Sequence, residues 1–122
     1  MKNKANFLHF LIIGITAFTA ILLLDSCRKC SGEQPRARLV NKGTKEADFQ
    51  IVPASGSTIN VKGVAPGAAS GFSSFAPGKT TITIFVDKAS YPRIYPMAEC
   101  VEYEIVIDAN GVVTSSSSDR NN

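Results

Sequence analysis

Apolar and polar residues alternate with a period of two in two stretches of this chain, residues 81–86 and 101–108. In the first stretch, one face would carry Ile82, Ile84 and Val86. In the second, one face would carry Val101, Tyr103, Ile105 and Ile107, and the opposite face Glu102, Glu104 and Asp108. This period is typical of β-strands that pack one face against a core. Both stretches are therefore predicted to be β-strands.

Five further strands are predicted at residues 36–41, 47–52, 58–62, 70–75 and 112–114. The first three each place two apolar side chains on one face, namely Ala37 with Leu39, Phe49 with Ile51, and Ile59 with Val61. In the fourth, Phe72 and Phe75 break the alternation, which indicates a bulge. The dipeptide Asn110-Gly111 precedes the last strand and favours a tight hairpin.

Turn-forming residues separate the strands at intervals of roughly ten residues, as in a β-sandwich. The turns are expected at Asn41-Lys42-Gly43, Ser55-Gly56-Ser57, Pro66-Gly67 and Pro77-Gly78. The sequence thus predicts an all-β fold, a single antiparallel β-sandwich of about seven strands over residues 36–114. Its core is expected to contain Phe49, Ile51, Ile59, Val61, Ile82, Ile84, Val86, Tyr103, Ile105 and Ile107.

Residues 87–99 interrupt this rhythm and are expected to form a long, extended crossover loop. The loop would display Tyr91, Arg93 and Tyr95 between prolines that limit its freedom. Because tyrosine and arginine are enriched in binding hot spots, these three residues are the candidate partner-binding site. The alternative is that the segment only links the two sheets and its tyrosines cap the sandwich edge.

The N-terminus has the order of a secretory signal. Lys2 and Lys4 are followed by an apolar run over residues 7–24, and a small residue, Ser26, precedes Cys27. Leu24-Asp25-Ser26-Cys27 resembles the lipobox of bacterial lipoproteins, although Asp25 is an uncommon residue there. The resemblance implies an N-terminal signal helix, cleavage after Ser26 and a lipid on Cys27.

The alternative is an uncleaved transmembrane helix, because residues 7–24 are near the minimum length that spans a bilayer. Both interpretations export the C-terminal part, since the lysines stay cytoplasmic. The predicted organisation is a signal peptide at 1–26, a polar tether at 27–35, the sandwich at 36–114 and a disordered serine-rich tail at 115–122. The expected location is the cell envelope, on the outer membrane facing the periplasm in a Gram-negative host.

The net charge of the chain argues against nucleic acid as a partner. The net charge is +3, and removing two lysines and one aspartate with the signal leaves +2, too little and too scattered for a nucleic-acid interface.

With Cys27 lipidated, Cys30 and Cys100 form an even pair in an oxidising compartment, which predicts a disulfide. The alternative is a free Cys30 thiol and a buried Cys100.

Half of the exported chain carries motifs of a recognisable kind. Residues 37–41 (Ala-Arg-Leu-Val-Asn), 48–51 (Asp-Phe-Gln-Ile), 63–72 and 75–84 (Phe-Ala-Pro-Gly-Lys-Thr-Thr-Ile-Thr-Ile) resemble the uncharacterised immunoglobulin- or transthyretin-like domains of bacterial envelope proteins. The resemblance implies a β-sandwich and carries no catalytic residue. The chain departs from the pattern in its acidic strand at 99–104 and its serine tail.

The reactive side chains argue against an enzyme. The only histidine, His9, lies in the predicted signal, so the exported chain would build no Ser-His-Asp or Cys-His site. Glu102 and Glu104 share one strand face and are expected to be solvated rather than to flank a cleft. No catalytic residue and no cofactor are predicted.

The composition offers two candidate metal sites, and neither is predicted to bind a metal. Asp108-Ala109-Asn110-Gly111 is expected to be a hairpin turn and supplies too few oxygen ligands for calcium. Met97 and Cys100, with Cys30, could hold a soft metal such as Cu(I), but Met97 is expected to pack in the core. The sequence therefore predicts a non-catalytic lipoprotein that acts as a structural or interaction module, its partners being the membrane and an envelope protein. The alternative is a small-molecule or soft-metal binding protein.

Overall fold

The structure, a computed structural model, describes residues 30–120, and every regular element in this range is a β-strand. The strands are β1 (Arg36–Lys42), β2 (Ala47–Val52), β3 (Ile59–Val64), β4 (Ser73–Ser74), β5 (Gly78–Val86), β6 (Ala89–Met97), β7 (Val101–Asp108) and β8 (Val113–Asp119). Within residues 30–120 no helix is long and apolar enough to cross a membrane. The predicted signal helix and Cys27 lie outside the described residues.

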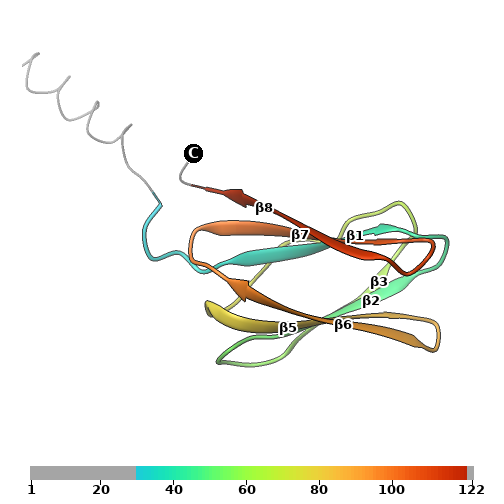
Figure 1. The fold of residues 1–122 in the computed structure, drawn as a ribbon, viewed down its shortest axis with the longest axis horizontal. Helices are drawn as coiled ribbons and strands as arrows, with labels where there is room; N and C mark the ends of the chain where they lie inside the picture. Colours follow the sequence, from blue (N-terminus) through green and yellow to red (C-terminus); the bar gives the residue numbers. More distant parts are fainter. Residues whose placement is uncertain (1–29, 121–122) are drawn as a thin grey trace, which may run out of the picture.

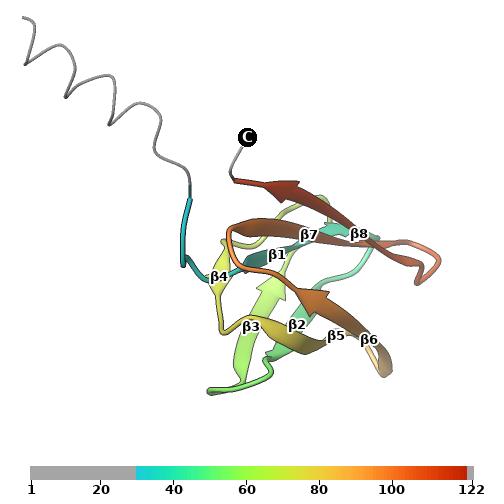
Figure 2. The same ribbon diagram turned by 60° about the vertical axis from the view of Figure 1, so that its left-hand side comes forward.

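The strands form two four-stranded sheets that lie face to face (Figures 1 and 2). One sheet has the order β4-β1-β7-β8 and the other the order β3-β2-β5-β6. The predicted β-sandwich architecture is therefore confirmed. The prediction that it is wholly antiparallel is wrong, because β1 and β7 pair in parallel from Arg36↔Glu102 to Lys42↔Asp108. Both strands start at the end of the sandwich where Cys30 is bonded to Cys100, so they run in the same direction.

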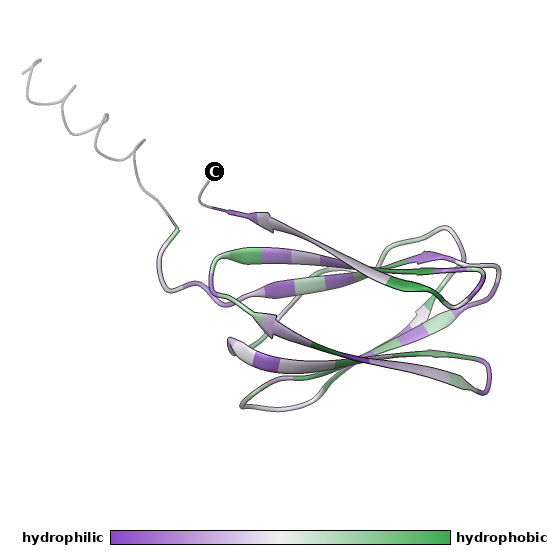
Figure 3. Cartoon of the chain, in the orientation of Figure 1, coloured by the Kyte–Doolittle hydropathy of each residue, from purple (hydrophilic) through white to green (hydrophobic). Residues whose placement is uncertain are grey.

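The core lies between the sheets and consists mainly of the alternating residues. Figure 3 shows hydrophobic and hydrophilic positions following one another along several strands. Six of the ten predicted core residues are fully buried: Phe49, Ile51, Ile82, Ile84, Ile105 and Ile107. The other four, Ile59, Val61, Val86 and Tyr103, are partly buried and pack against them. Residues of the apolar core cluster that the alternation did not single out are Ala47, Val64, Phe75 and Met97.

The segment predicted as a long loop, residues 87–99, is mostly a strand. Val86 pairs with Ala89, so Asp87 and Lys88 form a two-residue turn, and Asp87 has the positive φ of 53° that such a turn requires. Strand β6 then pairs with β5 along nine residues. Its prolines are tolerated because β6 is an edge strand, where a ring nitrogen can face away from the neighbouring strand.

The tail predicted to be disordered is also a strand as far as residue 119. β8 pairs with β7 from Ile107↔Val113 to Val101↔Asp119. Its four serines are exposed and bury little, as their composition indicates. Backbone pairing with β7 does not require buried side chains, so a polar repeat can form an edge strand. The last two residues, 121–122, lie outside the described range.

Two smaller features differ from the predictions. The strand expected at 70–75 is reduced to β4, two residues long. The bulge occurs in β3 instead. Opposite the β2 residues Ala47 and Phe49, β3 contains one extra residue between Val61 and Val64, so the register shifts. There Gly63 has a φ of +71° and donates its N–H to the Asp48 carboxylate over 3.0 Å. This bulge interrupts the pairing of β3 before its last pair, Val64 with Ala47, and a bulge increases the local twist of a strand.

Candidate functional site

A disulfide joins the segment before β1 to one end of the sandwich. We call this segment, the predicted tether at 27–35, the leader. Cys30 and Cys100 are bonded, with their Cα atoms 5.9 Å apart, which confirms the predicted pairing. Cys100 also donates its N–H to the Glu33 carbonyl over 3.0 Å and accepts the Arg120 N–H over 2.8 Å. The bond therefore joins the leader to the start of β7 and to the end of β8.

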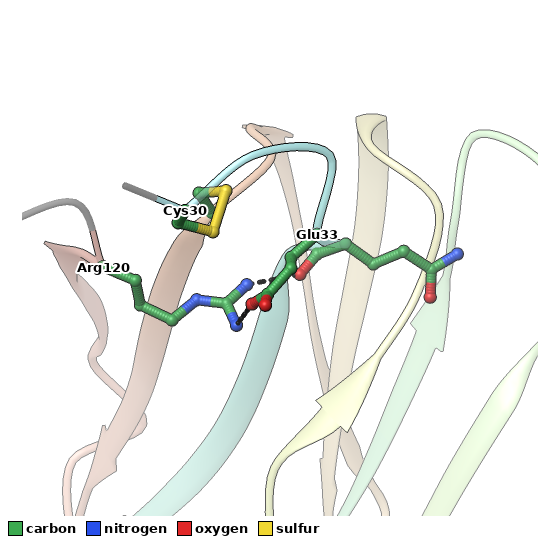
Figure 4. Close-up of a disulfide and its surroundings, with 5 residues drawn as sticks. Cys30, Glu33 and Arg120 are labelled. Atoms are coloured by element: carbon green, nitrogen blue, oxygen red, sulfur yellow. Dashed lines mark hydrogen bonds and ion pairs between the residues drawn. A yellow bond between two sulfur atoms is a disulfide. The ribbon is translucent and has the colours of Figure 1, made fainter. Parts of the chain in front are cut away.

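The Arg120 side chain adds a second tie at this end (Figure 4). Its guanidinium donates to the Glu33 carboxylate over 2.8 Å and to the Gln34 carbonyl over 2.6 Å. Phe75 donates its N–H to the Pro35 carbonyl over 3.2 Å. The predicted tether at 27–35 is consequently part of the folded domain from Cys30 onward. Only residues 28 and 29 separate Cys27 from this fixed point.

The candidate partner-binding residues Tyr91, Arg93 and Tyr95 lie on β6 and not on a loop. They alternate with the outward-facing positions, so they share the face of β6 that is directed toward the core. Tyr91 and Tyr95 are partly buried and pack against the core, whereas Arg93 is exposed and donates to the Pro92 carbonyl over 2.7 Å. On the outer face of the same strand, Ile94 is 59% exposed. The two tyrosines therefore contribute to packing, and Arg93 and Ile94 are the accessible side chains.

Glu102 and Glu104 lie on the outer face of β7, where each carboxylate forms an ion pair with an arginine of the parallel strand β1. Glu102 pairs with Arg36, and Glu104 accepts bonds from Nε and the terminal nitrogen of Arg38. The Phe72 ring lies 4.7 and 4.8 Å from the two guanidinium carbons. The contacts of the Phe72 ring with the two arginines hold the segment before β4 against β1. It places the two carboxylates in charge pairs across one flat face, and not on opposite sides of a cleft.

The opposite end of the sandwich contains a hollow of about 620 Å³. It lies between the β1–β2 turn, the β5–β6 turn and the β7–β8 turn. Apolar side chains from three strands, Val86, Tyr91 and Ile107, line it together with polar groups of the turns, Thr44, Lys45, Asp87, Lys88 and Asp108. Its volume lies within the range of roughly 300–1,000 Å³ that small-molecule sites occupy.

Asn41 positions the β1–β2 turn beside this hollow, and no sequence pattern singled it out as buried. It is 1% exposed. Its amide donates to the Lys45 carbonyl over 2.8 Å and to the Val64 carbonyl over 2.9 Å, and its side-chain oxygen accepts the Gly43 N–H over 2.9 Å. One buried side chain thus ties the β1–β2 turn to the end of β3.

Three charged side chains of the hollow, Lys45, Asp87 and Asp108, are engaged in hydrogen bonds. Lys45 donates to the Asp87 carboxylate, and this hydrogen bond, together with the charge attraction, raises the pKa of Lys45 above its ordinary value. Asp108 accepts the N–H groups of Asn110 and Val112 over 2.8 and 2.9 Å. These bonds form the hairpin turn that Asn110-Gly111 predicted.

The residues considered as metal ligands are not brought together as a site. In the described part of the chain, no group of three or more histidine, cysteine, aspartate or glutamate side chains is placed to hold a metal ion. Cys30 and Cys100 are joined to each other, which leaves neither thiol as a ligand. Met97 is 3% exposed and belongs to the core.

These features define a small β-sandwich-like domain that is closed by a disulfide at one end and hollowed at the other. The fold is similar to the NMR structure of a protein from Eubacterium rectale, with a TM-score of 0.52 and 17% identity over 72% of this chain and 91% of that chain. The N-terminal domain of AlgF from P. aeruginosa aligns with a TM-score of 0.46 and 24% identity over 68% of this chain and 90% of that chain. The first likeness supports the fold alone, and the second is too low to carry an argument. No family model and no curated protein matches the sequence.

Proposed function

We propose that this chain is a bacterial envelope lipoprotein, anchored through Cys27, whose sandwich is a non-catalytic structural or protein-interaction module close to the membrane. The observation that carries the proposal is the Cys30–Cys100 disulfide. Disulfides of this kind persist in oxidising compartments outside the cytoplasm. The bond therefore agrees with the export that the N-terminal signal predicts.

The position of the disulfide also determines how far the domain can move from the anchor. Three residue steps separate Cys27 from Cys30, and they span at most about 11 Å when fully extended. Without the bond, the nine steps to Arg36 would allow about 32 Å. A lipidated chain of this kind would hold its disulfide end next to the membrane surface. In a Gram-negative host we place it on the outer membrane, facing the periplasm.

Two further features support a module without catalytic chemistry. The resemblance to immunoglobulin- or transthyretin-like envelope domains rests on turn and core residues, which fits a structural role. The paired acidic residues that could have served as a catalytic pair, Glu102 and Glu104, are each held by an arginine.

Fatty-acid labelling and membrane fractionation in a bacterial host test the anchor. Cys27→Ala should lose the label and leave the membrane fraction, because the sulfur that would carry the lipid is gone. Cys30→Ser is the matched control, since it removes another cysteine of the same leader and should keep the label. A Cys27→Ala chain that is still labelled and membrane-bound would contradict the proposal.

The second candidate function is binding of a small molecule, and the hollow at the end opposite the disulfide favours it. Its lining combines apolar side chains with polar groups, as ligand sites do. A soft metal would need reduction of the Cys30–Cys100 bond before either sulfur could bind it. Thermal unfolding in the presence of metabolite and metal panels separates the candidates: a ligand-binding protein gains stability with its ligand, and an interaction module shows no shift.

A further inference from the structure

The outer side of β8 is an unpaired strand edge. β8 ends the sheet order β4-β1-β7-β8, and within residues 30–120 no other strand lies beyond it. It is seven residues long and contains four consecutive serines. Figure 3 shows it as pale over most of its length, without a hydrophobic stripe. An edge of this length presents a row of backbone donors and acceptors to another strand.

The pairing of β8 with β7 shows which backbone groups point outward. The Asp108 N–H donates to the Val112 carbonyl over 3.1 Å, and the Arg120 N–H donates to the Cys100 carbonyl over 2.8 Å. Both bonds fit the register of the β7–β8 ladder. Since bonding direction alternates along a strand, even-numbered residues of β8 bond to β7. The N–H and C=O groups of Val113, Ser115 and Ser117 therefore point to the open side.

The other three sheet edges are blocked in different ways. β4 is only two residues long. β3 carries Lys62 and the bulge at Gly63, both of which discourage pairing. On β6, Pro92 and Pro96 are four residues apart and therefore on the same side, so two of the outward positions lack an N–H. β8 has no proline, no lysine and no bulge, and is the one long edge of the described sheets without such protection.

We infer that β8 pairs with β8 of a second copy of this chain, antiparallel, around a two-fold axis at Ser116. This deepens the interaction role proposed above. The pairing would join two four-stranded sheets into one continuous eight-stranded sheet. A second copy fits because β8 is complementary to itself. With Ser116 opposite Ser116 of the second copy, outward-facing Ser115 meets outward-facing Ser117, as antiparallel hydrogen bonding requires.

This register also uses the whole strand and avoids charge repulsion. The axis passes through Ser116, the middle residue of the strand, so that the stretch from Thr114 to Ser118 pairs with the same stretch of the second copy. The stretch from Thr114 to Ser118 is uncharged, and Asp119 comes to lie opposite Val113 of the second copy. Thr114 and Ser118 meet across the axis on the outer face, where paired hydroxyl side chains stabilise a sheet. Any shift of the register leaves strand residues unpaired.

The lipid anchor, which rests on the proposed function, restricts how such a dimer would lie. β8 runs toward the disulfide end, since Arg120 follows it and bonds to Cys100. Antiparallel pairing therefore puts the two Cys30 residues at opposite ends of the joined sheet. With leaders of at most about 11 Å, both anchors reach one bilayer only if the strands lie along the membrane plane.

A cysteine placed on the axis tests the pairing in the full-length chain, expressed in a bacterial envelope and mildly oxidised. In the inferred dimer, the two Ser116 Cα atoms form a non-hydrogen-bonded pair about 4.5 Å apart, within the range of a disulfide. Ser116→Cys should therefore give a cross-linked homodimer on a non-reducing gel. Ser118→Cys is the matched control, because it is exposed on the same face, but its two copies would lie about 13 Å apart.

Two further variants separate specific pairing from random collision. Thr114→Cys and Ser118→Cys chains expressed together should cross-link to each other, because these positions are opposite in the inferred register. Adding Ser117→Pro to Ser116→Cys should abolish the homodimer by removing an outward N–H that β7 does not use, so that the fold is retained. Roughly tenfold more dimer is expected from Ser116→Cys than from Ser118→Cys, because disulfide geometry is strict.

Three results would overturn the inference: monomeric Ser116→Cys, equal cross-linking of Ser116→Cys and Ser118→Cys, or cross-linking of Ser116→Cys to a different protein. Fatty-acid labelling of the same samples keeps this test apart from that of the anchor. A labelled, membrane-bound and monomeric Ser116→Cys chain would refute self-pairing and leave the lipoprotein proposal standing. A cross-linked chain without label would do the reverse.

Discussion

Tyr91 and Gly111 are in such close contact that a Cβ atom added to Gly111 would lie 2.7 Å from the Tyr91 hydroxyl oxygen. The contact joins β6 of one sheet to the β7–β8 turn of the other, beside the hollow at the open end. Gly111 also has a φ of +79°, which disfavours any side chain. Two independent constraints therefore act on one glycine.

Gly111→Ala should destabilise the domain more than the backbone strain alone explains. Gly56→Ala is the matched control, since Gly56 has a φ of +93° but nothing within 4 Å of its would-be Cβ atom. The strain common to both should cost about 1–2 kcal/mol. The clash with Tyr91 should add about 1–3 kcal/mol at Gly111, the usual cost of overpacking. Denaturant unfolding of a soluble chain beginning at residue 28 measures both, and equal losses would contradict the proposed contact.

Asn41→Ala should lower the free energy of unfolding by several kcal/mol. The substitution leaves the buried Val64 carbonyl without its donor, at a cost of about 1–3 kcal/mol, and also removes the bonds to the Lys45 carbonyl and the Gly43 N–H. Asn60→Ala is the control, because Asn60 is exposed and makes one side-chain bond of 3.2 Å to Gln50. The same unfolding measurement compares them, and an Asn41→Ala change no larger than that of Asn60→Ala would refute this role.

Ile84→Ala and Ile105→Ala should each cost about 2–5 kcal/mol, the range for emptying a core site. Both side chains are fully buried, on opposite sheets. Ile94→Ala removes the same atoms from an exposed position and should stay within about 0.5 kcal/mol of the wild type. Chemical denaturation followed by circular dichroism measures the three variants. A loss at Ile94 as large as at Ile84 would mean that the outer face of β6 is covered.

The disulfide should protect both cysteines from alkylation in the unreduced protein, as mass spectrometry can measure. Replacing Cys30 and Cys100 together by serine should lower the stability by roughly 4 kcal/mol, the chain-entropy value for a closed loop of this length. The sequence separation of the two cysteines is 70 residues. Modification of both thiols without reductant would show that the bond does not form.

Arg93→Ala and Tyr91→Ala should have different effects, because the two side chains have different surroundings. Tyr91 packs against the core and Arg93 is exposed. Tyr91→Ala should destabilise the domain, whereas Arg93→Ala should leave its thermal unfolding unchanged. If β6 contacts a partner in the envelope, Arg93→Ala should weaken cross-linking to that partner. A folded Arg93→Ala variant with unchanged cross-linking would place the contact elsewhere.

The central strands of each sheet were predictable because each pairs with a strand on both edges and packs one face against the core. β1, β2, β5 and β7 each have a strand neighbour on either edge, and their inner faces fill the core, so their apolar residues must alternate. The disulfide could be predicted, as one of two alternatives, from the even pair of cysteines in a chain expected to be exported. The hairpin after β7 followed from Asn110-Gly111, a dipeptide whose backbone preference is local.

Two of the edge strands, β6 and most of β8, were not predictable in the same way. β6 and β8 each bond to one neighbouring strand only, and their outer positions need not be buried. Prolines are therefore tolerated in β6 and serines in β8, and neither sequence shows the apolar alternation that predicts a strand. The buried role of Asn41 was equally hidden, because its partners Lys45 and Val64 are set by how turns from different strands meet.

The all-β class, the inner faces of the central strands and the signal-like order of the N-terminus could be predicted from local composition and spacing. The disulfide could be predicted only as one of two alternatives, because whether Cys30 meets Cys100, 70 residues further along the chain, depends on the fold. The tertiary structure alone decided the parallel pairing of β1 with β7, the hollow between three turns and the open edge at β8. These features arise from contacts between residues far apart in the chain, such as Arg36 with Glu102 and Tyr91 with Gly111. The backbone preferences of single residues carry no information about such contacts, because the packing of the two sheets brings these residues together.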